Sequence, residues 1–310
     1  MIVTVTPNVA LDRTLLVRGY AIGGTHRASE VLLVAGGKGP NVARVARALG
    51  VPALALGLVG GVTGRLFAEM ATREGLPTEF VWIAGETRNT INVVDPEAPS
   101  STLINEPGPV VNANEWEAFA ALVRVRAAGS DLVTFNGSLP RGVPAEALAD
   151  LARALCAAGI RLVIDTSGEA LRLSLSVSPW LVKVNGEEAG EALGWPVRAL
   201  ADAQRAAREM RERGAQMVIL TLGADGAVVS SPEGDWWAVP PTVRALCPVG
   251  SGDALLAGWA VGLLQGKPLS EALRLAVAVA AANALTLGAG YFRQDDLDRL
   301  LPQVRVQRLG

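Results

Sequence analysis

Short apolar runs alternate along the chain with stretches in which apolar residues recur at helical spacing. A run of four to eight apolar residues is typical of a buried strand, and a spacing of i, i+3, i+4 and i+7 is typical of a helix. The runs predict strands at 2–6, 53–59, 132–136, 161–165, 181–184 and 217–222. The helical spacing predicts helices near 40–49, 64–74, 114–127, 144–158, 199–213 and 252–265. Such alternation implies a mostly parallel central sheet with helices on both faces, so the expected fold class is α/β.

Two regions, residues 12–34 and about 78–106, lack this alternation. They contain strand-like runs with no helical pattern between them, at Leu15–Val17, Thr90–Val94 and Ser101–Asn105. The runs predict either a small second sheet or an extension of the main sheet at its edge. On the first interpretation, the two excursions form a small β unit, and the α/β domain consists of residues 1–11, 35–77 and 107–310.

Residues 248–258, PVGSGDALLAG, combine a glycine turn with the start of a helical pattern. Backbone N–H groups of Gly250, Ser251 and Gly252 at the positive end of a helix dipole form a site for an anion. Asp253 places a carboxylate beside that site, where it is unfavourable unless it accepts a proton or meets a metal. Phosphoryl transfer needs this pairing of a base with N–H donors. The alternative is that Asp253 is an ordinary acid in the first turn of a helix.

A second glycine loop, AGGKGPN, occupies residues 35–41. Val31–Val34 is predicted to be a buried strand, and Pro40 suits the first position of the helix that follows. Gly36 and Gly37 allow a ligand to approach the backbone, and Lys38 adds a positive charge. The alternative is an ordinary strand-to-helix turn with an exposed lysine.

Composition excludes several classes of protein. The chain has 310 residues, of which 50% are hydrophobic, so it can bury a large core. A formal charge of −2 argues against a nucleic-acid-binding protein. Two cysteines suit a reduced cytoplasm, and no signal-like run opens the chain. The Ala-rich run 272–282 contains Arg274, which argues against a membrane span.

Nearly the whole chain resembles the ribokinase-like, or PfkB, family of sugar kinases. The resemblance rests on the order of TVTPNVALDRT, AGGKGPNVARVARALG, ETRNTINVV, INEPGP, NGSLPRGVP, IDTSGEAL, LVKVNGEEAG, LTLGADGAV and PVGSGDALLAG. The GGKG loop, Thr87-Arg88 and IDTSGEAL are most similar to the branch that contains 1-phosphofructokinases and tagatose-6-phosphate kinases. The chain departs from the family at Val184, where proline is usual, and at Ser251, where alanine is frequent; both departures bear on fine specificity.

The resemblance implies a three-layer sandwich in which the small sheet is a lid over the sugar site, and often a dimer interface. It implies ATP and Mg²⁺ as cofactors and leaves a monovalent cation open. The expected substrate is a hexose monophosphate, fructose 1-phosphate first, with tagatose 6-phosphate or fructose 6-phosphate as alternatives. A non-catalytic sugar-phosphate-binding protein stays open. A nicotinamide-dependent dehydrogenase is disfavoured, because no G-x-G-x-x-G turn follows the first strand.

The resemblance also assigns roles to individual residues. Asp253 is the base, since the one histidine, His26, flanks the lid. Substrate binding is assigned to Asp12, Arg27, Gly36, Gly37, Lys38, Asn41, Arg88 and Asn105. Of these, the cations Lys38, Arg88 and Arg27 are expected to bind the substrate phosphate, and Asp12 and Asn41 to orient the sugar hydroxyls. Nucleotide binding is assigned to Lys183, Asn185, Thr221, Gly223, Gly226 and Asn283, and Mg²⁺ binding through water to Glu188. Asn185 and Glu188 also suit a helix-capping arrangement, LGADG suits a hairpin without a ligand, and Asn105 suits a turn residue.

Overall fold

The computed structural model describes residues 1–97 and 101–310. Its main sheet has the strand order β14-β13-β12-β11-β10-β9-β8-β1-β4-β5, and the strands from β11 to β5 are parallel. The last three strands in the chain add to one edge in antiparallel fashion. The strands are β1 (Ile2–Thr6), β4 (Ala53–Val59), β5 (Thr78–Trp82), β8 (Leu132–Asn136), β9 (Leu162–Asp165), β10 (Leu181–Asn185), β11 (Met217–Thr221), β12 (Ala227–Ser231), β13 (Gly234–Val239) and β14 (Arg305–Leu309).

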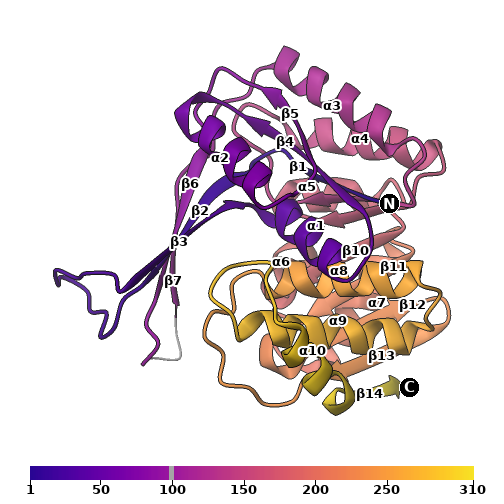
Figure 1. Ribbon diagram of the computed structural model, residues 1–310. Coiled ribbons are helices and arrows are strands. Elements are labelled where there is room, and N and C mark those ends of the chain that lie inside the picture. Colours follow the sequence, from indigo (N-terminus) through magenta and orange to yellow (C-terminus); the bar gives the residue numbers. More distant parts are fainter. Residues whose placement is uncertain (98–100) are drawn as a thin grey trace.

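Helices cover both faces of this sheet (Figure 1). Successive strand residues point to opposite faces, so Ile2 packs in one hydrophobic cluster and Val3 in the other. The Ile2 face holds α1 (Lys38–Ala48), α8 (Ser251–Leu264), α9 (Leu269–Ala284) and α10 (Gln294–Leu300). The Val3 face holds α3 (Ala113–Ala127), α4 (Ala145–Ala157), α5 (Gly168–Leu175), α6 (Gly186–Leu193) and α7 (Leu200–Glu212). The predicted α/β fold with its mostly parallel sheet is confirmed.

A second sheet with the order β3-β2-β6-β7 projects from the main body (Figure 1). Its strands are β2 (Ala10–Leu16), β3 (Glu30–Gly36), β6 (Arg88–Val94) and β7 (Ser101–Asn105). The helix α2 (Gly61–Arg73) packs against it through Phe67 and Ala71. The sequence therefore indicated the second sheet correctly, although residues 98–100 of the predicted lid region lie outside the described residues.

Two sequence predictions about this sheet were wrong in detail. Residues 78–82, which were assigned to the lid, form β5 and pair with β4 at the edge of the main sheet. Val31, which was predicted to lie in a buried strand, is 54% exposed, because β3 is an edge strand of the small sheet. Among the helices of the described chain, none is long and apolar enough to cross a membrane.

Strand order reverses direction between β1 and β8, since β4 and β5 lie to one side of β1 and β9 to β11 lie beyond β8. Ligands of open α/β sheets bind at the carboxyl ends of the strands beside such a switch point. The first strand of the small sheet, β2, follows three residues after the carboxyl end of β1, so the small sheet begins beside this switch point.

Candidate active site

A cavity of about 640 Å³ lies at the carboxyl ends of the main-sheet strands and extends to the small sheet. It is lined by residues from β1, β2, β6, β7 and β10, from the loops after β8 and β9, and from the helices α1, α6 and α8. Most of the predicted site residues line it: Asp12, Gly37, Lys38, Asn41, Arg88, Asn105, Lys183, Asn185, Glu188, Gly250, Gly252 and Asp253. Gly36, Arg27, Ser251, Thr221, Gly223, Gly226 and Asn283 are not among its lining residues. The sequence thus predicted most of one cavity from widely separated motifs.

The helix α8 starts at the cavity with its glycine turn. Gly250 is the N-cap residue with φ of 84°, a left-handed conformation that favours glycine, and no side chain caps the helix. A Cβ on Gly250 would come within 2.6 Å of the Ala289 side chain. Gly252 lies next to the Lys183 side chain: a Cβ added to Gly252 would be 3.0 Å from Lys183 Nζ. The uncapped helix start therefore faces a cation-lined cavity and suits an anionic ligand.

Asp253 lies in the first turn of α8 and is buried at 6% exposure. Its Oδ2 accepts a hydrogen bond from Asn41 Nδ2 at 2.8 Å. Burial, together with the negative charge of Asp165, raises the pKa of Asp253 to about 6 in spite of the nearby Lys183 and Lys38. A carboxylate with a pKa near neutrality is suited to accept a proton in catalysis.

Two residues predicted to act at this site, Ser251 and Asn283, make hydrogen bonds that hold the loop at the start of α8. The N–H of Ser251 donates to the Pro248 carbonyl oxygen at 3.1 Å, so it is not free for an anion. Asn283 is fully buried, and its Nδ2 donates to Val249 O at 3.1 Å and Ser251 Oγ at 3.3 Å. Its Oδ1 accepts from Gly290 N at 2.8 Å. The Asn283 amide thus braces the loop before α8, and its nucleotide-binding role stays a prediction.

Asp165, at the end of β9, is a buried carboxylate that the sequence analysis did not assign to the site. It accepts from Lys38 Nζ at 2.8 Å and from Lys183 Nζ at 3.2 Å. Burial raises its pKa, but the two lysines prevail and hold it below the usual value. The pKa of Lys38, lowered by burial, is raised above its usual value by Asp165, Glu188 and Asp253. Three carboxylates thus keep Lys38 charged beside the start of α8.

The small sheet contributes a second polar cluster, centred on Arg88. The guanidinium donates to Asn8 O at 3.3 Å, to Asn105 Oδ1 at 3.3 Å and to Thr90 Oγ1 at 3.4 Å. Asp12 lies beside it, and burial raises the pKa of Asp12 to about 6 against the opposing effects of the Gly37 N–H and the Arg88 charge. These bonds are long, so Arg88 keeps capacity for stronger, bidentate bonds to a phosphate.

Gly36 and Arg27 have different positions from those that the sequence suggested. A Cβ on Gly36 would lie 2.0 Å from the Asp12 carboxyl carbon, so this glycine makes room for Asp12 and does not line the cavity. Arg27 is exposed in the connection between β2 and β3. Arg27 does not line the cavity of this single chain, and its binding of the substrate phosphate stays a prediction.

Asn185 and Glu188 form a capping box at the start of α6, the alternative that their spacing left open. Glu188 Oε2 accepts from the Asn185 N–H at 2.9 Å, and Oε1 lies 3.6 Å from Lys38 Nζ. Oε1 has only this longer ion pair, so it can also accept from a water of Mg²⁺, which keeps several waters and binds substrate phosphates. Within residues 1–97 and 101–310, no group of three or more His, Cys, Asp or Glu side chains is arranged to hold a metal.

Thr221 is the last residue of β11 and pairs with Asn185, the last residue of β10, so both lie at the carboxyl ends of neighbouring strands. Gly223 and Gly226 shape the turn between β11 and the antiparallel β12, with φ of 60° and 90°. A Cβ on Gly226 would come within 1.8 Å of Ala238 O. LGADG therefore forms the turn of a hairpin, and a nucleotide contact by these residues stays a prediction.

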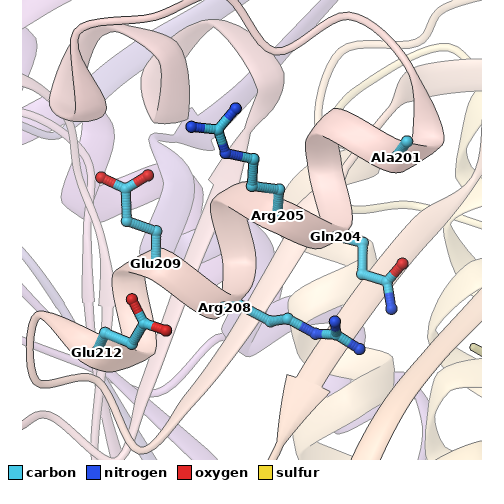
Figure 2. Close-up of a pocket in the computed structure, with 6 residues that line it drawn as sticks. All are labelled: Ala201, Gln204, Arg205, Arg208, Glu209 and Glu212. Carbon is cyan, nitrogen blue, oxygen red and sulfur yellow. The ribbon is translucent and has the colours of Figure 1, made fainter. Parts of the chain in front are cut away.

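A second hollow lies on the outer side of α7 (Figure 2). Gln204 and Arg208 donate to the Asp235 carboxylate and to Gly310 O, which fastens β13 and the end of β14 to the helix. Arg205 lies over the Trp195 ring at 4.6 Å. All the lining residues come from one helix and several of them make structural contacts, so the first cavity remains the candidate active site.

The family model of the pfkB carbohydrate kinases matches residues 7–296. The chain belongs to this family of sugar kinases. It is therefore a phosphotransferase, which agrees with a buried base beside an uncapped helix start.

Relatives along the full chain agree with this membership. A 1-phosphofructokinase of Bacillus subtilis (strain 168) is 33% identical over 309 residues, which cover 100% of both chains. A tagatose-6-phosphate kinase of Staphylococcus epidermidis is 30% identical over 309 residues, which cover 99% of each chain. Among solved structures, Phosphofructokinase-2 from Escherichia coli in complex with substrates and products has a TM-score of 0.89 at 29% identity, with 97% of this chain and 98% of that chain covered.

The raised pKa of Asp253 predicts how the activity of this kinase depends on pH. Asp253 accepts a proton only when it is ionised, so kcat/KM should rise with pH through about 6 and level off above it. Ionisation of Asp12 near the same pH adds to this acidic limb. Initial rates between about pH 5 and 8 measure the limb, and a flat profile over that range would contradict the assignment of the base.

Proposed function

We propose that this chain transfers the γ-phosphoryl group of ATP to the 6-hydroxyl of fructose 1-phosphate. The observation that carries the proposal is the separation of two polar clusters in one cavity. Arg88 bonds to Asn8, Thr90 and Asn105, whereas Asp253 bonds to Asn41 and is influenced by Lys38, Lys183 and Asp165. A hexose monophosphate with its phosphate at Arg88 presents a free primary hydroxyl to Asp253.

The residues of the cavity divide the chemistry between them. Asp253 removes the proton from the attacking hydroxyl, and Asp12 orients the sugar by accepting from its other hydroxyls. The start of α8 and Lys38 stabilise the charge that develops on the phosphoryl oxygens. Mg²⁺, when bound to ATP, neutralises charge on the phosphates, and Glu188 would hold it through water together with those phosphates. A monovalent cation stays a prediction.

Lid closure over the sugar is part of the proposal. The small sheet supplies Asp12, Arg88, Thr90, Leu103 and Asn105 to the cavity, so its position decides whether the substrate is enclosed. Enclosure excludes water that would otherwise accept the phosphoryl group.

A homodimer through the small sheet is proposed for the outer side of this lid. Val31 and Ile104 lie on its two edge strands and are 54% and 50% exposed, and Ile22 in the β2–β3 connection is 98% exposed. These exposed apolar side chains on the small sheet and its connection support an interface with another copy of the chain.

The experiment that tests the substrate is an ADP-release assay across four acceptors: fructose 1-phosphate, tagatose 6-phosphate, fructose 6-phosphate and free fructose. We expect fructose 1-phosphate to give the highest kcat/KM, because the 1-phosphofructokinase relative is similar over its whole length. Free fructose should be far behind, since it leaves Arg88 without its anionic partner. Equal rates with free fructose would contradict the proposal, and no ADP release with any acceptor would favour a non-catalytic binding protein.

Tagatose 6-phosphate is the second candidate substrate. It is favoured by the relative that is a tagatose-6-phosphate kinase, at nearly the same identity as the 1-phosphofructokinase relative. It has the same two-ended geometry, so the ranking in the assay decides between the two sugars.

A further inference from the structure

Arg44 lies on α1, three residues after Asn41, with a side chain that is only 10% exposed. All of its five N–H groups have acceptors. Nε donates to Glu74 Oε2 at 3.0 Å. Nη2 donates one hydrogen to Glu74 Oε2 at 2.6 Å and the other to Ala35 O at 2.9 Å. Nη1 donates to Asn41 Oδ1 at 3.0 Å and to Ala289 O at 3.2 Å. A guanidinium with every donor used is held in one orientation.

The bond from Arg44 decides which end of the Asn41 amide faces the base. Arg44 has donors and no acceptor, so only the amide oxygen of Asn41 can bond to it. The amide nitrogen is then directed to Asp253, to which it donates at 2.8 Å. In the reversed orientation, the amide oxygen would face the carboxylate of Asp253 and the donor would be lost. Arg44 therefore selects the orientation that stabilises the ionised base.

A second set of contacts links Arg44 to the loop at the start of α8. Nη1 of Arg44 donates a hydrogen bond to Ala289 O, and the guanidinium lies over the Tyr291 ring at 4.6 Å from its centroid. Gly250 packs directly on Ala289, with no space there for a Cβ. The position of the 289–291 segment therefore sets the position of the glycine turn.

We propose that Arg44 is a positioning residue for phosphoryl transfer, which holds Asn41 toward Asp253 and fixes the segment on which Gly250 rests. This inference rests on the proposed function. The charged groups that face Asp253 are Asp165, Lys183 and Lys38, from β9, β10 and α1. Arg44 acts on the base through the Asn41 amide. A lysine cannot replace it, because one ammonium group does not reach Glu74, Asn41 and two carbonyl oxygens together.

Arg44→Met and Arg44→Lys in the full chain test the proposal. We expect kcat to fall roughly 10- to 100-fold in both variants, because a misplaced base and donor loop lose the aligned geometry. The acidic limb of kcat/KM should move to higher pH in both, since Asp253 loses a fixed hydrogen-bond donor. In Arg44→Met the lost charge also raises the pKa of Asp12, so Arg44→Lys, which keeps a positive charge, is the variant that reports on Asp253. KM for ATP should change much less than kcat. An unchanged limb and kcat in the folded variants would overturn the proposal.

Three further measurements separate positioning from folding and from the function itself. Arg208→Met removes another partly buried arginine–carboxylate pair, with Asp235, far from the cavity, and should lower Tm without moving the pH limb. If Arg44→Met does not fold, Glu74→Gln should move the limb in the same direction by a smaller amount. An infrared titration of Asp253 in the resting protein needs no turnover: its midpoint should rise in Arg44→Lys even if the substrate assignment fails, and an unchanged midpoint would overturn the proposal.

Discussion

Replacing Asp253 by asparagine is expected to lower kcat by roughly 10²- to 10⁴-fold, with ATP binding close to that of the wild type. The amide keeps the shape of the carboxyl group and can still accept from Asn41, but it cannot take a proton from the attacking hydroxyl. Single-turnover rates at saturating substrate measure the chemical step. More than about a tenth of the wild-type rate would mean that another group is the base.

The same variant should not lose stability. Because folding raises the pKa of Asp253, this carboxyl group stabilises the fold below the pKa of the unfolded chain, and that stabilisation is lost as pH rises through about 6. At neutral pH, asparagine removes the buried charge, so Tm should stay equal or rise. Asp235→Asn is the matched control: it is another buried aspartate, paired with Arg208 far from the cavity, and should lower Tm while kcat is kept.

Local patterns were sufficient for most of the fold. The strands at 2–6, 53–59 and 132–136 were predicted with the bounds they have in the structure, because buried parallel strands are short, apolar throughout and bordered by loops. The pattern failed for 78–82, where the choice of sheet depends on which strand lies nearby. β5 pairs with β4 in the main sheet, and nothing within TEFVW specifies that partner.

The part of the site formed by glycine turns at helix starts could be predicted from the sequence. A residue that acts only by positioning another side chain could not. Gly250 and Asp253 belong to one short motif, so their proximity follows from the chain. Asp165 could have been found, since IDTSGEAL places an acid at a strand end. Arg44 could not, because its partners other than Asn41 come from three further segments, at Ala35, Glu74 and Ala289, that only the folded chain brings together.

The sequence analysis grouped Lys38 with Arg88 as a ligand of the sugar phosphate, and the geometry separates them. Lys38 Nζ lies 2.8 Å from Asp165 Oδ1 and 3.6 Å from Glu188 Oε1, on the side of the cavity that leads to the capping box of α6. Arg88 bonds to Asn8, Thr90 and Asn105 on the small-sheet side. We therefore expect the two cations to contact different phosphates.

Lys38→Ala should lower kcat by about 10²-fold and leave KM for the sugar phosphate nearly unchanged, because its charge stabilises the group in transfer. Arg88→Ala should instead raise that KM by one to two decades, since a lost charge-assisted hydrogen bond costs about 1.5–3 kcal/mol. Steady-state kinetics with both substrates varied measure the split. Lys267→Ala, which removes an exposed lysine, is the control. Asp165 keeps Lys183 as a partner in Lys38→Ala, so its buried charge stays compensated. If Lys38→Ala raised KM for the sugar phosphate as Arg88→Ala does, with kcat intact, Lys38 would belong to the substrate phosphate after all.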